Sequence, residues 1–84
     1  MNKDRRNKLE KINDKLKAIK IEIENITSEL EDVLADEENA YDSMPEGLQN
    51  SERGTNSEES IDLMYDIEES LKRSIENIDD IVNM

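Results

Sequence analysis

The 84-residue sequence contains no cysteine and no histidine. Without cysteine, the chain forms no disulfide and offers no thiolate ligand to a metal. Without histidine, it lacks the usual general base and the commonest transition-metal ligand. Two tyrosines are its only aromatic residues, which argues against a base-stacking surface for single-stranded nucleic acid. We therefore expect a chain that is not an enzyme and that uses no cofactor and no metal.

Long apolar runs are also missing from the sequence. No stretch of 18 apolar residues occurs, so we expect no membrane-spanning helix and no membrane partner. The basic residues at the start, Lys3, Arg5 and Arg6, are not followed by an apolar segment, so they do not resemble a signal peptide. These features predict a cytoplasmic protein.

The strongest pattern is a repeat of large apolar residues in the first half, spaced alternately by three and four residues. Its members are Leu9, Ile12, Leu16, Ile19, Ile23, Ile26, Leu30 and Val33. A period of 3.5 residues predicts a helix that buries a narrow stripe against another helix. We expect this helix over about residues 3–42, with the repeat acting as an oligomer seam.

The only proline and both glycines fall within residues 43–54, which we interpret as a linker. Ser43 with Glu46 fits a capping box that starts a short helical turn, and Gly54 fits a left-handed stop for that turn. Thr55 with Glu58 fits a second capping box. A second amphipathic helix is therefore expected over about residues 55–83.

Two helices joined by a short linker predict an all-α fold, an antiparallel helical hairpin with coiled-coil packing. The second helix is shorter and is expected to pair with about residues 16–42. Leu9 and Ile12 would then lie in an overhang that a second chain covers. The seam has mostly Leu at heptad position a and mostly Ile at position d, which favours more than two helices around the core. We therefore expect a homo-oligomeric helical bundle, with four helices from two hairpins as the smallest form.

Charge is distributed unevenly along the chain, whose net charge is −12. Residues 1–20 carry +5 and residues 21–84 carry −17. The basic segment either pairs with the acidic second helix or, in an oligomer, clamps a small anion through Arg5, Arg6 and Lys8. The net negative body should repel DNA and RNA, so we expect no direct binding to either.

The linker contains residues that a simple turn does not require, among them Tyr41 at its edge, Gln49 and Arg53. One interpretation is a helix–helix corner, in which Met44 and Leu48 close the end of the bundle. The other is a binding site, because Tyr41 and Arg53 suit contact with a partner surface or a phosphate.

Residues 40–54, Ala-Tyr-Asp-Ser-Met-Pro-Glu-Gly-Leu-Gln-Asn-Ser-Glu-Arg-Gly, and residues 58–62, Glu-Glu-Ser-Ile-Asp, carry a resemblance. They resemble a group of small helical-hairpin proteins encoded by phages and prophages of low-GC Gram-positive bacteria. Their pattern is approximately A-[YF]-D-x-[ML]-P-E-x-L-Q-x-S-x-R-G followed by E-E-x-I-D and an acidic helix. The resemblance implies a phage accessory gene acting in the cytoplasm of an infected bacterial host.

Small acidic phage proteins without enzymatic activity often antagonise host defence, and this analogy supplies the leading functional hypothesis. The chain would block a host defence protein or sequester a small anionic, cyclic-nucleotide immune signal. A first alternative is a structural coiled-coil adaptor or assembly protein of a phage. A second alternative is an inhibitor that imitates the phosphate array of DNA with its acidic helices.

Overall fold

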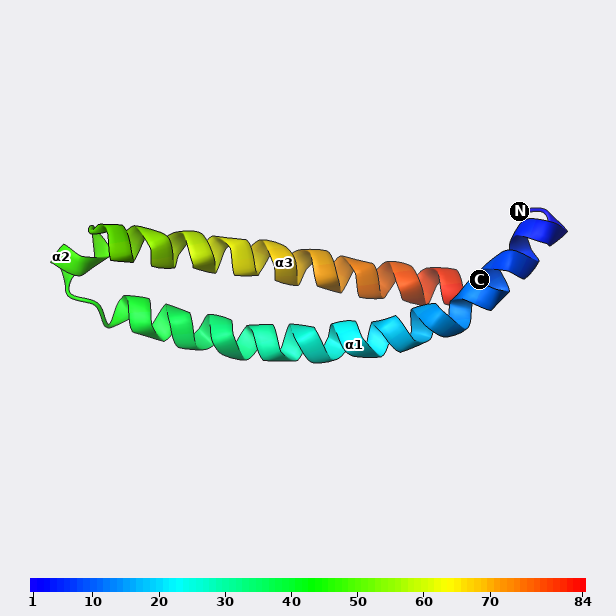
Figure 1. Cartoon of the computed structure of the whole chain (residues 1–84), viewed down its shortest axis with the longest axis horizontal. Coiled ribbons are helices and arrows are strands. Elements are labelled where there is room, and N and C mark those ends of the chain that lie inside the picture. Colours follow the sequence, from blue (N-terminus) through cyan, green and yellow to red (C-terminus); the bar gives the residue numbers. More distant parts are fainter.

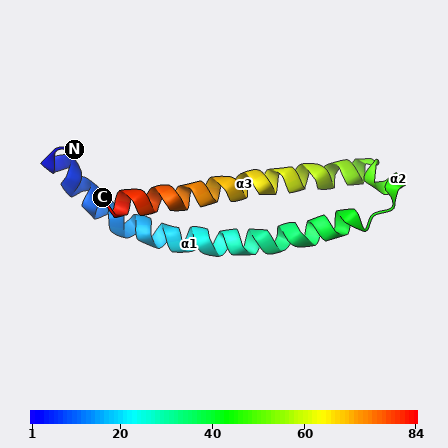
Figure 2. The same cartoon turned by 180° about the vertical axis from the view of Figure 1, so that it is seen from behind.

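The computed structural model describes residues 1–84 and consists of three helices without strands: α1 (Lys3–Asp42), α2 (Glu46–Gln49) and α3 (Glu52–Val82). The long helix α1 packs against α3, which runs in the opposite direction, and α2 lies at the turn between them (Figure 1). The view from behind shows the same two rods side by side (Figure 2). The molecule measures 63 × 19 × 14 Å. No helix is long and apolar enough to cross a membrane.

Helix α1 begins after Asn2, whose side-chain oxygen accepts a hydrogen bond from the backbone N–H of Arg5 at 2.9 Å. Such a cap satisfies one of the backbone donors that a helix start leaves free. No glycine or proline interrupts the helix for 40 residues. It ends at Ser43, and Pro45 follows two residues later, where it cannot continue the backbone hydrogen-bond ladder.

The capping box predicted at the start of the linker is wrong. Ser43 closes α1, with its N–H bonded to the carbonyl oxygen of Asn39, so it caps no following helix. The predicted short helical turn exists as α2, but Pro45 stands at its N-cap without a side-chain hydrogen bond. The φ of −56° at Pro45 already has a value suited to a helix start, so the turn forms without a capping box.

The start of the second long helix was also predicted incorrectly. Helix α3 begins at Glu52, not near Thr55, because Ser51 serves as its N-cap and accepts from the N–H of Gly54 at 3.5 Å. The hydroxyl of Ser51 in turn donates to the carbonyl oxygen of Leu48 at 2.5 Å, which ties α2 to the start of α3. Gly54 is therefore helical, and no residue of the chain has a positive φ.

Gly54 is needed for close packing and not for a left-handed turn. It is buried, and a Cβ built on it would lie 2.1 Å from the carbonyl oxygen of Gln49 and 2.5 Å from that of Leu48. Both are backbone atoms, so no side-chain rotation could relieve the contact. A glycine here lets the end of α2 rest directly on the first turn of α3.

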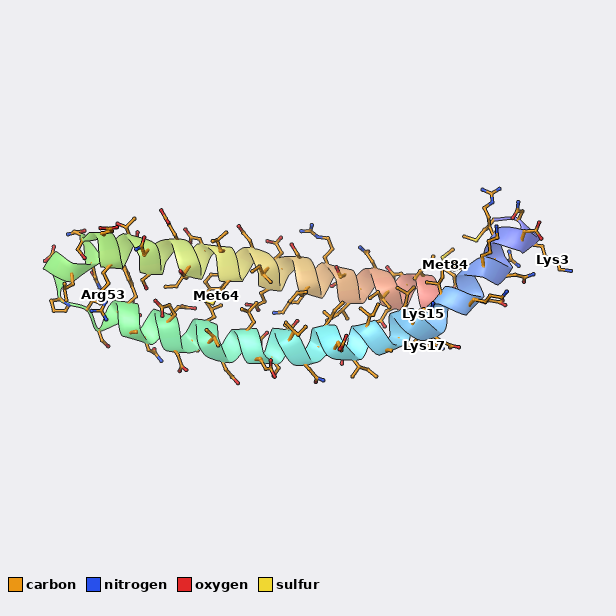
Figure 3. The ribbon with its side chains drawn as sticks, viewed as in Figure 1. Lys3, Lys15, Lys17, Arg53, Met64 and Met84 are labelled. Atoms are coloured by element: carbon orange, nitrogen blue, oxygen red, sulfur yellow. The ribbon has the colours of Figure 1, made fainter.

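The residues between α1 and α3 also follow a 3,4 spacing, but many are polar. On α1 they are Asn13, Leu16, Lys20, Ile23, Thr27, Leu30 and Leu34; on α3 they are Ser57, Ile61, Met64, Glu68, Leu71, Ile75, Ile78 and Val82. Met64 can be seen between the two helices in Figure 3. Leu34, at 5% exposure, is the one buried apolar side chain. A single hairpin therefore has very little core for its length.

Candidate functional site

The predicted seam is divided between two directions. Leu9, Leu16, Ile23 and Leu30 are half-buried. Leu9 lines a hollow together with Ile81 and Met84, so the end of the chain partly covers it and it does not lie in a free overhang as predicted. Ile12, Ile19, Ile26 and Val33 are between 45% and 55% exposed. Their places against α3 are taken by the residues one position later, Asn13, Lys20, Thr27 and Leu34. Their role in an oligomer stays a prediction.

The four exposed residues form a line along α1, because each is seven residues from the next and seven residues make about two helical turns. On a helical wheel the midline of all eight seam residues is rotated by about 60° from the direction in which α1 meets α3. The apolar side of α1 therefore points between α3 and the open side of the hairpin. A helix in a four-helix bundle, with two neighbours, has this arrangement.

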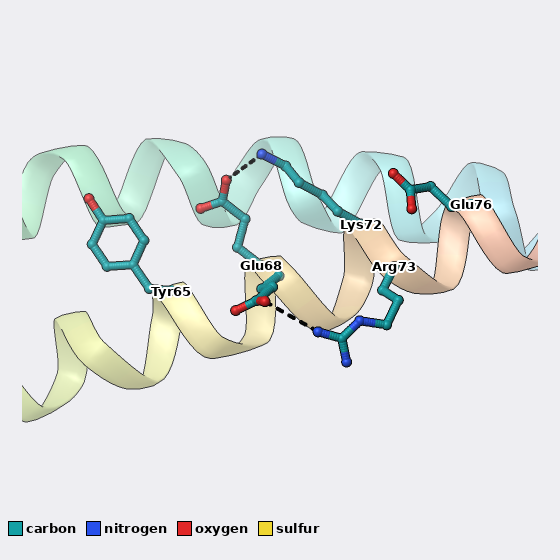
Figure 4. A pocket seen from close by; sticks show the side chains of 6 residues that line it. Tyr65, Glu68, Lys72, Arg73 and Glu76 are labelled. Carbon is teal, nitrogen blue, oxygen red and sulfur yellow. Dashed lines mark hydrogen bonds and ion pairs between the residues drawn. The ribbon is translucent and has the colours of Figure 1, made fainter.

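The opposite side of the hairpin is held by polar contacts between the two long helices, and we call it the polar side. Its contacts are Lys20–Asp79 at 2.5 Å, Lys72–Glu31 at 3.5 Å, Tyr65–Glu38 at 2.6 Å and a short hydrogen bond from Tyr41 to Glu58. Lys72 also pairs with Glu68 at 2.7 Å, and Arg73 with Glu69 at 3.2 Å (Figure 4). These groups are exposed or only partly buried, so each contact contributes little to stability.

The position of the four exposed residues around α1 can be compared with that of the polar side. Ile26 and Val33 each precede a polar-side residue, Glu31 and Glu38, by five positions. Five residues turn about 140° around a helix, so the line of four exposed residues lies nearly opposite the polar side. On α3, Ile67 precedes Lys72 by the same five positions and is half-exposed. We call Ile12, Ile19, Ile26, Val33 and Ile67 the apolar face.

Polar residues inside the helix interface were missed by the sequence analysis. Thr27 is buried and satisfies its hydroxyl by donating to the carbonyl oxygen of Ile23 at 2.7 Å. Ser57 is buried and donates to Glu37 at 2.6 Å. The Oδ1 of Asn13 is buried without a hydrogen-bond partner. The polar residues Asn13, Lys20 and Thr27, spaced seven residues apart beside an apolar line, were the available signal.

The candidate linker residues lie together at the turn. The side-chain amide of Gln49 donates to the backbone oxygen of Tyr41 at 2.9 Å, while the Tyr41 hydroxyl donates to Glu58. Both side chains thus hold the corner between α1 and α3. Arg53 is exposed, and it takes part in none of the five ion pairs in the structure. A role for these three residues in ligand binding stays a prediction.

The candidate residues of the basic end lie far from the linker. Arg5, Arg6 and Lys8 are exposed on the first turns of α1, and Figure 3 shows Lys3 and Arg53 at opposite ends of the rod. Arg6 lines a hollow of about 490 Å³ together with Leu9, Ile81 and Met84. One chain therefore does not bring the two groups of cations into a common site.

Both tyrosines donate hydrogen bonds to carboxylates, and this affects their titration. The bond to Glu58 raises the pKa of Tyr41, and the bond to Glu38 raises the pKa of Tyr65, with partial desolvation and the negative charge adding to each shift. A hydrogen bond that only the protonated phenol can donate favours that form. The pKa of Lys20 is raised mainly by its hydrogen bond to Asp79, and that of Lys72 by its hydrogen bond to Glu68.

These shifts predict a loss of stability at high pH. A tyrosine whose pKa is raised in the folded state stabilises the hairpin at pH values below its pKa in the unfolded chain, 10.0. This contribution is lost as the pH rises through the pKa of the folded state. Absorbance titration of tyrosinate should give midpoints above 10.0 in the native protein and a return to that value in denaturant. Tyr41→Phe isolates Tyr65, and a native midpoint at the ordinary value would contradict its contact with Glu38.

No group of three or more carboxylates is arranged to hold a metal ion. No protein-family model, curated protein or solved structure matches the chain.

Proposed function

We propose that this chain is a non-enzymatic phage accessory protein that acts by binding, as an oligomer assembled through its apolar face. The observation that carries the proposal is that Ile12, Ile19, Ile26 and Val33 are half-exposed in one line on a hairpin that buries only Leu34 among its apolar residues. Exposed apolar side chains aligned on one side of a helix mark an interaction site. Covering this line with further helices would supply the core that one hairpin lacks.

We propose further that the assembly counters host defence in the cytoplasm of an infected bacterium. The phage context comes from the resemblance of residues 40–62 to phage and prophage hairpin proteins. The targets are a host defence protein or a small anionic nucleotide signal. Arg53, Arg5, Arg6 and Lys8 are exposed cations, and none forms an ion pair within one chain. Arg53, at the turn, is the one we expect to contact such a partner in the assembled protein.

Phage plating on hosts with and without a defence system tests the counter-defence function. Expression of the chain should restore plaque formation on at least one defended host whose defence uses a nucleotide signal or a protein effector. Ile19→Asp with Ile26→Asp should abolish the rescue, whereas Ile21→Asp, at an exposed position outside the apolar face, should preserve it. Rescue that is absent across such hosts would contradict the counter-defence function.

Native mass spectrometry of gently purified protein separates the two kinds of target. An oligomer with an added mass corresponding to a nucleotide would support sequestration of a signal, and loss of that mass in Arg53→Ala would assign the site to the linker. An oligomer without added mass would favour a defence protein as target. The adaptor alternative instead predicts an unassembled chain with a free apolar face, and DNA mimicry predicts binding to a basic protein that weakens steeply with salt.

A further inference from the structure

We propose that two copies of this chain pack through their apolar faces with their α1 helices antiparallel, so that the basic end of each copy lies against the acidic turn end of the other. The inference rests on the self-association proposed above and adds the partner's orientation. The occupant of the apolar face is a second copy. In the product, the two α1 helices pair along their length and the two turns lie at opposite ends.

Two hairpins that pack face to face around a two-fold axis have two simple arrangements. If the axis runs along the helices, both turns lie at one end, and each α1 packs over the other copy's α3. If the axis crosses the helices, the turns lie at opposite ends, and each α1 packs over the other copy's α1. The charges at the two ends of the rod distinguish these arrangements.

The charges favour the crossed axis. Residues 3–11 carry five basic and two acidic side chains, whereas residues 34–42 carry four acidic and no basic side chains. With the axis along the helices, the two basic ends would lie side by side, and so would the two acidic ends. With the axis across them, residues 3–11 of each copy lie along residues 34–42 of the other. Charge complementarity of this kind sets the orientation of partners more than their affinity.

The four α1 residues of the apolar face are consistent with the crossed axis. The midpoint of α1, halfway between Lys3 and Asp42, falls between Ile19 and Ile26. A two-fold axis at this point places Ile19 opposite Ile26 of the second copy, and Ile12 opposite its Val33. The line is thus self-complementary, and α1 overlaps the second α1 over its whole length.

The contact between the two α1 helices is long. They overlap over all 40 residues, about 60 Å at 1.5 Å per residue. The first turns of α1, which extend past the end of α3 in Figure 1, would gain a partner at the same time.

Distance measurement between spin labels tests the orientation. The chain has no cysteine, so Gly47→Cys gives one labelling site, and a side chain there meets no atom within 4 Å. Gly47 lies in α2 at the turn. The proposal predicts labels separated by about the length of the rod, 63 Å, in the dimer. A separation near the 19 Å width would place the turns together and overturn the proposed orientation.

The outcomes separate this inference from the proposed function. A dimer with a short label distance overturns the orientation and leaves self-association intact. A monomer at the concentration used in the measurement overturns both. Labelled chains mixed with unlabelled protein provide the control, because fewer dimers then carry two labels and the distance signal should weaken accordingly.

A matched pair of charge variants tests the electrostatic argument. Arg6→Glu and Arg73→Glu change the net charge equally at exposed positions, one at the basic end and one on the polar side. The proposal predicts that Arg6→Glu raises the dimer Kd about threefold or more relative to Arg73→Glu, because two such contacts weaken in each dimer. If the basic ends lay side by side, Arg6→Glu would instead lower the Kd, and that result would overturn the orientation.

Discussion

Replacing Ile19 and Ile26 together by aspartate is expected to convert the protein from an oligomer to a monomer. Each substitution would bring a carboxylate into an apolar contact between hairpins, and in a dimer four such groups would lose water without gaining a partner. We expect the dissociation constant to rise by at least about 100-fold. Sedimentation velocity over a range of concentrations measures the change directly.

The chain offers a control of the same residue type on the same helix. Ile21 is 61% exposed and lies outside the apolar face, so Ile21→Asp should shift the dissociation constant little. Ile19→Ser with Ile26→Ser supplies a milder change should the aspartate variant unfold. If either double variant kept the oligomeric mass of the unsubstituted chain, the apolar face would not be the interface.

The Gly54→Ala substitution is expected to destabilise the hairpin, although alanine is a far better helix former than glycine. Its Cβ would meet the backbone oxygen of Gln49 at 2.1 Å, so α2 would have to move away from α3. Overpacking of this kind costs about 1–3 kcal/mol, and displacement of the Ser51 cap would add to the cost. The gain of about 1 kcal/mol in helix propensity does not offset this loss.

Gly47→Ala is the matched control for this effect. Nothing lies within 4 Å of a Cβ at Gly47, which is also helical, so the same substitution there should raise the free energy of unfolding by up to about 1 kcal/mol. Urea unfolding of the two variants at equal protein concentration should therefore give shifts of opposite sign. A Gly54→Ala variant as stable as Gly47→Ala would show that α2 does not rest on the first turn of α3.

Pattern alone was sufficient to predict the all-helical architecture. A period of 3.5 residues in two segments and the gathering of Pro45 with both glycines between them indicated two long helices. The exact start of α3 could not be predicted, since Ser51 and Thr55 are both suitable N-caps and tertiary contact with α2 selects Ser51. A left-handed Gly54 was the ordinary expectation near a helix boundary, and only the position of the Gln49 carbonyl reveals its actual role.

The face that each helix presents to the other was harder to predict. The 3,4 spacing predicts one seam that contains Ile12, Ile19, Ile26 and Val33 together with Leu16, Ile23 and Leu30, because apolar residues are expected to pack together. Within one hairpin, Thr27 and Lys20 occupy the contact instead, since Thr27 bonds its own helix and Lys20 reaches Asp79. An apolar stripe that packs against two neighbouring helices has the same residue spacing as one that packs against a single helix, so the sequence does not distinguish them.

Sedimentation equilibrium of the unsubstituted chain tests the central claim most directly, because the claim is that a second copy covers the apolar face. The chain has a mass of 9.7 kDa. We expect a dimer of twice this mass at micromolar concentration, together with a thermal midpoint that rises with protein concentration, as mass action requires. A stable species of 9.7 kDa with a midpoint independent of concentration would contradict the account.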